Sequence, residues 1–145
     1  MSEKILVGAD HAGFALKQRI VDELKKLGHQ PVDLGPDKLD PADDYPDFAK
    51  RVAAGVSKGE AKLGVLTCGT GIGMAMAANR YPGVRAAVVW SPEVAELSRK
   101  HNDANVLTIP AWSMDEDDVL EALRRWLATT FEGGRHARRV QKIER

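Results

Sequence analysis

Short apolar runs alternate along the chain with longer segments in which apolar residues recur at helical spacing. Each run is four or five residues long and rich in Val, Ile or Leu, which is typical of strands buried on both faces. We therefore predict strands at Ile5–Ala9, Gln30–Leu34, Leu63–Thr67, Ala86–Trp90 and Val106–Ile109.

The segments between these runs have the period of amphipathic helices. In the first segment Leu16, Ile20 and Leu24 fall on one face, and Gly28 follows where a helix would end. Helices are expected at Phe14–Leu27, Tyr45–Lys58, Ile72–Arg80, Pro92–His101 and about Met114–Phe131, with a basic tail after the last.

Strands that alternate with helices favour parallel pairing through right-handed crossovers. Five such units predict an α/β fold, a doubly wound five-stranded parallel sheet in the order 2-1-3-4-5, with helices on both faces and a C-terminal tail. No internal repeat or linker divides the chain, so residues 1–145 are expected to form one domain.

Charge and composition narrow the classes of function. Lys plus Arg total 21 and Asp plus Glu total 21, so no net charge draws the protein to nucleic acid or to a membrane. The single cysteine excludes an intrachain disulfide and favours a reducing compartment. The first residues lack the features of a signal peptide, and no apolar stretch approaches the ~18 residues of a membrane helix. We expect a cytoplasmic protein.

The predicted strand ends carry the chemical groups, and ligands bind at the carboxyl ends of strands in sheets of this kind. The first strand ends in Asp10 and His11, the third leads into Cys68, and the helix after the fourth ends in His101. We expect these groups to lie on one rim or close to it, with the loop Gly35–Asp44 beside them. A helix cap is the alternative role for Asp10, although it does not account for His11.

Three alternate glycines, Gly69, Gly71 and Gly73, open the helix after the third strand. This chain has Met74 at the position where a dinucleotide fingerprint needs glycine and where a low-molecular-weight cysteine phosphatase needs arginine. A P-loop needs a lysine after its glycines, and no lysine follows here. What remains is a group of backbone N–H donors at a positive helix end, which favours a phosphate or a reaction oxyanion. A tight turn without a ligand is the alternative.

Cys68 stands at the start of this glycine run, beside a helix N-terminus that favours the thiolate. A thiolate next to oxyanion donors can attack a carbonyl or remove a proton beside one, and the sequence does not separate these two reactions. An inert buried cysteine is the alternative.

The basic tail, if helical, places Arg135, Arg139 and Lys142 on one face, where they would clamp a phosphate or simply face solvent. His29 and His136 are expected on the surface. The four histidines have no paired spacing and no Cys/His cluster exists, so we expect neither a metal nor another cofactor.

Several motifs in order resemble those of the ribose-5-phosphate isomerase type B family, which includes galactose-6-phosphate isomerase subunits. The resemblance covers essentially the whole chain and rests on Gly8–Gly13, Asp44–Pro46, Cys68–Gly73, Ala77–Arg80, Leu97–Asp103 and Glu132–His136. It implies a Rossmann-like domain that forms a homodimer, sometimes a tetramer, with each site built from two subunits. It also implies metal-independent interconversion of aldose and ketose phosphates through a cis-enediol.

The resemblance implies a role for each matching residue. Cys68 would remove the proton next to the carbonyl, Thr70 would move protons between the two oxygens, and His101 with Asp10 would open the sugar ring. The enediolate would be stabilised by the backbone amides of Gly69, Gly71, Ile72 and Gly73.

The remaining matches imply substrate contacts. Asn102 and Tyr45 would orient the sugar, while the phosphate would be held by His11, Arg135 and Arg139. The default substrates are ribose 5-phosphate and ribulose 5-phosphate, a step of the pentose phosphate pathway.

Two positions differ from part of the family. Some members use a glutamate where this chain has Met74, so the chain resembles the cysteine type. Many members carry a phosphate-binding arginine where this chain has Trp112. The tryptophan indicates either a shifted substrate, such as a tetrose or hexose phosphate, or a side chain that fills a dimer seam. A non-catalytic sugar-phosphate or nucleotide-binding module and a cysteine hydrolase are the other hypotheses.

Overall fold

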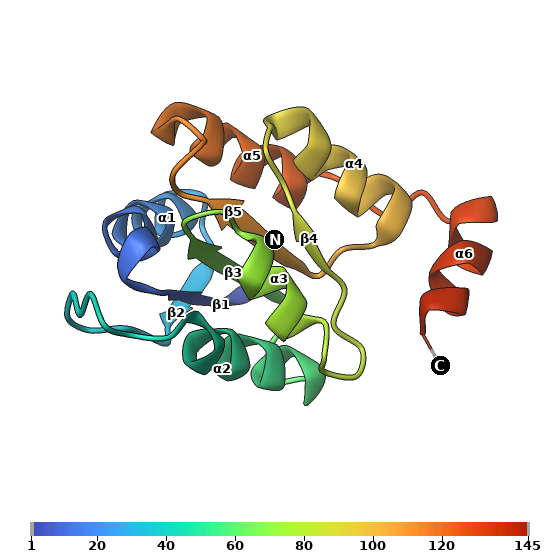
Figure 1. The fold of residues 1–145 in the computed structure, drawn as a ribbon. Coiled ribbons are helices and arrows are strands. Elements are labelled where there is room, and N and C mark those ends of the chain that lie inside the picture. The colour runs from blue at the N-terminus through green and yellow to red at the C-terminus, as the bar shows by residue number, and fades with distance from the viewer. Residues whose placement is uncertain (1, 145) are drawn as a thin grey trace.

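A computed structural model describes residues 2–144 as five parallel strands between two layers of helices (Figure 1). The strands are β1 (Lys4–Ala9), β2 (Gln30–Asp33), β3 (Leu63–Cys68), β4 (Ala86–Val88) and β5 (Val106–Pro110). The helices are the 3-10 turn η1 (His11–Gly13), α1 (Phe14–Lys26), α2 (Tyr45–Ser57), α3 (Ile72–Ala78), α4 (Pro92–Asn102), α5 (Glu116–Ala128) and α6 (Arg135–Ile143). Every predicted element is present, and the α/β class is confirmed.

The strand order differs from the prediction. The sheet runs β2-β1-β3-β5-β4, so β5 lies between β3 and β4 instead of at the edge. All five residues of β5 are buried, whereas the three residues of β4 are partly exposed. Central places in a parallel sheet go to strands buried on both faces, and the short β4 is better suited to an edge.

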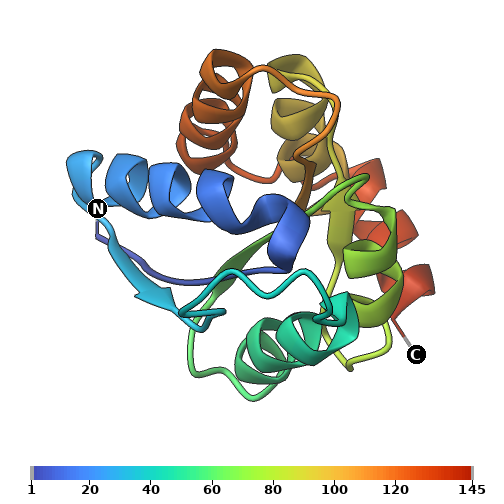
Figure 2. The same ribbon diagram turned by 60° about the vertical axis from the view of Figure 1, so that its left-hand side comes forward.

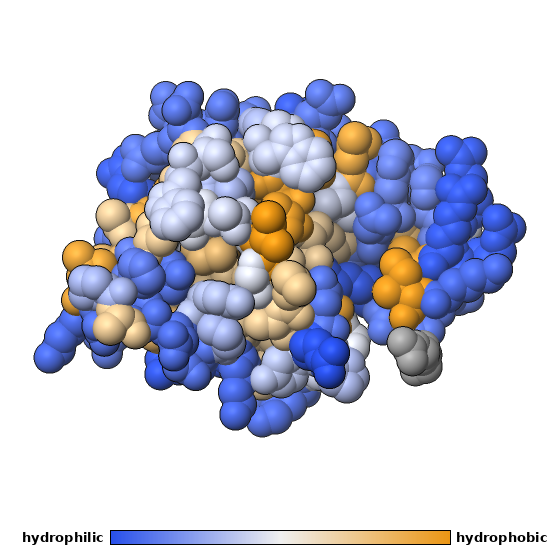
Figure 3. All heavy atoms as spheres, viewed as in Figure 1, coloured by the Kyte–Doolittle hydropathy of each residue, from blue (hydrophilic) through white to orange (hydrophobic). Residues whose placement is uncertain are grey.

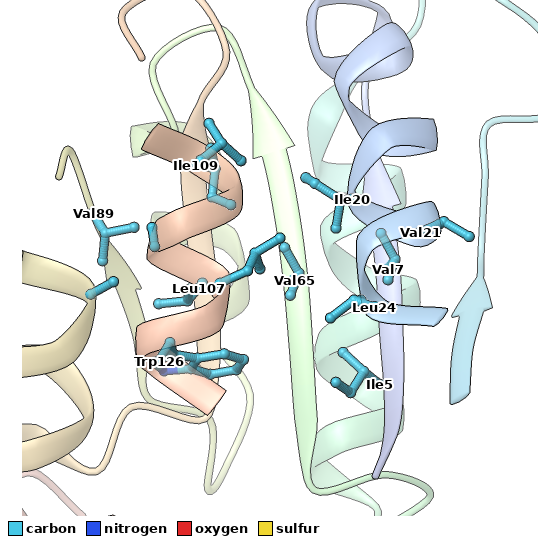
Figure 4. Close-up of a cluster of buried hydrophobic side chains, with 14 residues drawn as sticks. Ile5, Val7, Ile20, Val21, Leu24, Val65, Val89, Leu107, Ile109 and Trp126 are labelled. Atoms are coloured by element: carbon cyan, nitrogen blue, oxygen red, sulfur yellow. The ribbon is translucent and has the colours of Figure 1, made fainter. Parts of the chain in front are cut away.

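Two apolar clusters lie on opposite faces of the sheet because successive strand side chains point to opposite sides. Val65 and Leu107 contact α1 and α5 through a cluster that includes Trp126 (Figure 4). Leu66 packs on the other face with residues of α2 and α3, such as Val52. Figure 2 shows the resulting layers, with α1, α4 and α5 on one side and α2 and α3 on the other. The sheet thereby gives the loops at its edges a fixed support.

The basic tail forms α6, which packs against α4 at the side of the molecule (Figures 1 and 2). Its inner residues His136 and Val140 are buried. Just after α6, Glu144 forms a 2.7 Å ion pair with Arg85. Within the described chain no helix has both the length and the apolar character needed to cross a bilayer.

Candidate active site

A cleft of about 400 Å³ lies at the carboxyl ends of β1 and β3, the edge at which the sequence predicts a site. Its lining residues are Asp10, His11, Ala12, Tyr45, Cys68, Gly69, Thr70, Ile72, Gly73, Met76 and Trp112. Most of the site residues expected from the sequence therefore meet in one cavity. The exceptions, described below, are Gly71, which lies in the glycine loop, and four residues at the end of α4 and on α6.

The thiol of Cys68 lies under the glycine loop. The backbone N–H of Gly71 donates a hydrogen bond to Sγ at 3.2 Å, and the cysteine is only 5% exposed. Hydrogen bonds of this kind stabilise a sulfur anion. Gly71 adopts a φ of +74°, and a Cβ atom there would lie 3.3 Å from the backbone of β5. A residue without a side chain is therefore required where the loop donates to the sulfur.

Two aromatic rings pack directly on this loop. A Cβ atom on Gly69 would lie 2.6 Å from the indole ring of Trp112, and one on Gly73 would lie 2.6 Å from the ring of Tyr45. Trp112 comes close because its backbone N–H donates to the backbone carbonyl of Gly69 at 3.0 Å. This bond continues the pairing of β3 with β5. The glycines thus let two aromatic side chains border the cleft. The hydroxyl of Thr70 accepts the N–H of Ile72 at 3.2 Å.

Asp10 is buried, and its carboxylate accepts hydrogen bonds from the backbone. Its Oδ1 accepts the N–H groups of Ala12 at 3.0 Å and of Gly13 at 3.2 Å. The helix cap considered from the sequence is therefore present. Asp10 also lines the cleft, so a cap does not exclude contact with a ligand.

His11 is held by a residue that the sequence analysis did not single out, Asp43. The carboxylate Oδ1 of Asp43 lies 2.7 Å from His11 Nδ1 and accepts the His11 backbone N–H at 3.0 Å. Asp43 raises the pKa of His11 above 6.5, chiefly through the side-chain hydrogen bond. It belongs to the loop Gly35–Asp44, which lies beside the site as expected. The four aspartates of that loop are the one feature of the sequence that could have indicated an acidic partner for His11.

His101 and Asn102 do not lie on the cleft. They form the last turn of α4, which leads to the start of β5, and Asn105 accepts the N–H of Gly64 at the start of β3. The end of α4 is therefore at the amino ends of the strands, opposite Cys68. The expectation that His101 shares a rim with Cys68 in one chain was wrong, because a crossover helix returns the chain to the far edge of the sheet.

His101 has a partner that the sequence did not reveal, His136 of α6. The two rings stack with centroids 4.3 Å apart and planes inclined by 13°. His136 is only 6% exposed, so the expectation that it lies on the surface was wrong. Burial, and then the nearby charge of His101, lowers the pKa of His136, although Glu132 acts in the opposite direction.

The side chains of His101, Glu132 and His136 bring their ligand atoms within 4.8 Å of one another. However, each imidazole donates its lone pair in the plane of its ring. Two rings that stack face to face cannot both direct a lone pair at one ion unless one of them turns. The arrangement therefore fits aromatic packing better than a metal centre.

Arg135 and Arg139 are exposed on α6, close enough to affect the charge of His136. With His101 and Asn102 they form a second group, here called the α4–α6 group. Asn102 also borders a larger cleft of about 730 Å³, which includes Arg85. The residues expected in one site are thus divided between two regions of the chain.

Apolar side chains gather beside the Cys68 cleft. In Figure 3 they lie over α3 in the middle of the face shown. α3 exposes Ile72 and Met76, and Trp90 and Trp112 are also exposed, Trp112 by 74%. An exposed apolar patch of this kind commonly marks a binding surface.

Comparison with known proteins identifies close relatives. Residues 5–143 match the family model described as Ribose/Galactose Isomerase. The chain is 46% identical to the probable ribose-5-phosphate isomerase B of Mycoplasma genitalium, over 100% of this chain and 96% of the relative. It is 42% identical to ribose-5-phosphate isomerase B of Escherichia coli, over 97% and 94%.

Solved structures agree with these sequences. Ribose-5-phosphate isomerase B of Mycoplasma genitalium, solved with bound ribulose 5-phosphate, superposes with a TM-score of 0.94 at 45% identity, over 97% of this chain and 93% of the other. The type B enzyme of Trypanosoma brucei gives a TM-score of 0.95 at 41% identity, over 99% and 98%.

Proposed function

Because the chain belongs to the ribose/galactose isomerase family and is an aldose–ketose isomerase, we propose that its substrates are ribose 5-phosphate and ribulose 5-phosphate. The observation that supports this most directly is the cleft in which Cys68 lies under glycine amides. The solved relative with bound ribulose 5-phosphate, 45% identical, supports the choice of the pentose pair.

In the proposed mechanism the thiolate of Cys68 removes the proton from C2 of the open-chain aldose and later delivers it to C1. The electron pair of the broken C–H bond forms the double bond of the enediolate. The hydroxyl of Thr70 moves a proton from the C2 oxygen to the C1 oxygen, which leaves a carbonyl at C2. A positioned base contributes about 10²–10⁴-fold in rate, and an oxyanion donor about 10²–10³-fold.

The N–H groups at the start of α3 are suited to the negative charge of the enediolate. The N–H of Gly71 donates to the sulfur, that of Ile72 donates to the hydroxyl of Thr70, and Gly73 follows in the first turn of the helix. The backbone fixes the positions of these N–H groups beside the thiol, where the negative charge of the enediolate would develop.

We further propose that a second copy of the chain completes the site. In the described part of the chain, His11 supplies the one basic side chain among the residues that line the cleft. A phosphate dianion needs more positive charge than that, and the α4–α6 group offers two arginines at the opposite edge. The exposed apolar side chains beside the cleft supply a surface that a partner would cover. In this homodimer the α4–α6 group of each copy reaches the cleft of the other, where His101 would open the sugar ring.

A tetrose or hexose phosphate is the second candidate substrate, and Trp112 is the observation that favours it. The indole ring packs on Gly69 and borders the cleft where many members carry an arginine. It limits the space beside the thiol, which affects the length of sugar that fits.

The test is an assay of four-, five- and six-carbon aldose phosphates, followed by NMR in deuterated water. We expect the highest kcat/KM with ribose 5-phosphate, and solvent deuterium at C1 of the ribulose 5-phosphate formed. A higher kcat/KM for a tetrose or hexose phosphate would reassign the substrate. Binding without turnover or exchange for every sugar phosphate would contradict the proposal.

A further inference from the structure

We propose that Asp43 is a positioning residue that orients and charges the imidazole of His11 for the phosphate group of the substrate. The inference rests on the proposed function for the identity of the ligand, a sugar phosphate. The role of Asp43 itself follows from contacts within one chain.

The first observation is the geometry of the pair. One carboxylate oxygen of Asp43 accepts two hydrogen bonds from His11, from the backbone N–H at 3.0 Å and from Nδ1 at 2.7 Å. Two bonds to one residue fix both the backbone and the ring. Because Nδ1 must carry a proton to donate to a carboxylate, Nε2 remains as the ring nitrogen for a ligand. His11 lines the cleft that holds Cys68, and its side chain is 37% exposed.

The second observation is the burial of the carboxylate. The side chain of Asp43 is 9% exposed, and among the described residues its Oδ2 has no hydrogen-bond partner. A carboxylate removed from water in this way is costly unless a cation lies beside it. The buried carboxylate of Asp43 therefore favours a charged His11 even before a phosphate binds.

The third observation is the rigidity of the loop. The N–H of Asp43 donates to the carbonyl of Asp40 at 3.1 Å, and the N–H of Ala42 donates to the Asp40 carboxylate at 3.0 Å. Pro36 in the same loop accepts a hydrogen bond at 2.9 Å from Lys17, whose ammonium group also binds the carboxylate of Asp33. The loop is therefore tied to the body of the protein and presents Asp43 in a fixed place.

The negative charges around His11 all raise its pKa. Asp10 at the end of β1, and Asp40 and Asp43 in the loop, all raise its pKa, and burial opposes them only in part. Tyr45 at the start of α2 and Cys68 at the end of β3 also border the cleft. The imidazole is cationic below its pKa, so a raised pKa extends phosphate binding to higher pH. Without Asp43 the pKa of His11 would be lower, so this binding would fade at a lower pH than in the unaltered protein.

The decisive variant is Asp43→Asn, which keeps a carbonyl acceptor and removes the charge. Asp37→Asn is the matched control, because Asp37 is exposed in the same loop and is not among the groups that act on the pKa of His11. The ring of His11 is titrated by NMR, with and without inorganic phosphate, in the full-length protein. We expect a lower midpoint for His11 in Asp43→Asn and an unchanged midpoint in Asp37→Asn.

Kinetics supply the second measurement, with ribose 5-phosphate at pH 6 and pH 8. At pH 8 the KM of Asp43→Asn should rise about tenfold for each unit by which the midpoint falls, with little change in kcat. At pH 6 its KM should approach that of the unaltered protein. A KM that rises equally at both pH values would mean that Asp43 is only a loop anchor, and would overturn the inference.

The two proposals fail separately. If ribose 5-phosphate is not turned over but the His11 midpoint falls in Asp43→Asn and phosphate binding weakens with it, the proposed substrate is wrong and the role of Asp43 stands. If turnover is normal and the His11 midpoint is the same in all three proteins, the role of Asp43 is wrong and the proposed function stands.

Discussion

At the residue scale, the sulfur of Cys68 lies between an apolar cluster and the cleft. It belongs to the apolar cluster under α2 and α3, with neighbours such as Leu66 and Met74, and it also borders the cleft. Apolar packing limits access of water to the thiol, while the N–H of Gly71 supplies a polar contact on the cleft side. A sulfur held in this way can act on a carbon placed in the cleft without being open to bulk solvent.

Replacing the thiol tests the proposed base. Cys68→Ala should lower kcat by about 10²–10⁴-fold or more, while sugar-phosphate binding changes little. Removing one buried atom should cost about 1 kcal/mol of stability. Turnover and binding are measured by coupled assay and calorimetry, and urea unfolding checks the fold.

Cys68→Ser is the companion variant for this test. It restores the size of the side chain without an ionised group at neutral pH, so it should be as inactive as Cys68→Ala. Normal turnover in either variant would exclude the thiol as the base.

At the scale of elements, α3 depends on the left-handed residue before it. Gly71→Ala would force a Cβ to 3.3 Å from the backbone of β5 at a φ of +74°. We expect a loss of about 1–2 kcal/mol from the backbone conformation alone. A displaced loop would also lose the N–H bond to Cys68, so activity should fall well beyond the loss of stability.

Gly59→Ala is the control for this prediction. Gly59 has a similar φ of +81°, but a Cβ there would meet nothing within 4 Å. It should lose similar stability in urea unfolding and keep its kcat. Equal activity in the two variants would show that the loop geometry at Gly71 does not matter for catalysis.

The contact between α4 and α6 makes stability depend on pH. The folded state lowers the pKa of His136 below 6.5, so the unfolded chain binds more protons as the pH falls through that value. This contribution is absent above about pH 7 and destabilises the protein as the pH falls below 6.5. His136→Phe keeps an aromatic ring against His101 and removes the titration.

The measurement is the urea midpoint of both proteins at pH 7.5 and pH 5.5. We expect the unaltered protein to lose more stability between these values than His136→Phe does. Groups distant from His136 titrate alike in both proteins, so the difference between the two losses reports His136 together with its charge interactions with His101 and Glu132. Equal losses would show that His136 does not titrate as proposed.

At the scale of the whole molecule, the separation of Cys68 from the α4–α6 group is the reason for proposing that two copies form each site. The sheet lies between them, with Cys68 at the carboxyl ends of the strands and His101 at the amino ends. Symmetric pairing brings the same two surfaces together twice, so each dimer would have two complete sites.

Mixed dimers test this arrangement. Cys68→Ala and His101→Gln should each be inactive, but co-expression should produce dimers that hold one intact site. With random pairing, half of the dimers are mixed and half of their sites are intact, so the recovered activity should be about a quarter of that of the unaltered protein. An assay of the co-expressed mixture measures this quarter, and purification through two different affinity tags, which keeps only the mixed dimers, should raise the value to about a half. Two variants that stay inactive when combined would place each site within one chain.

The amino-acid sequence by itself determined the elements and the Cys68 cleft, because both depend on neighbours along the chain. The apolar period set each strand and helix to within a few residues. A residue that directly follows a parallel strand must lie at its carboxyl end, so Asp10, His11 and Cys68 could be placed together.

The tertiary structure decided what depends on competition between distant segments. β5 took the place expected for β4 because it buries both faces, and His101 met His136 at the far edge instead of Cys68. Asp43 reached His11 across more than 30 residues of sequence. Such contacts are chosen by the free energy of packing and desolvation over the whole molecule, which local spacing does not contain.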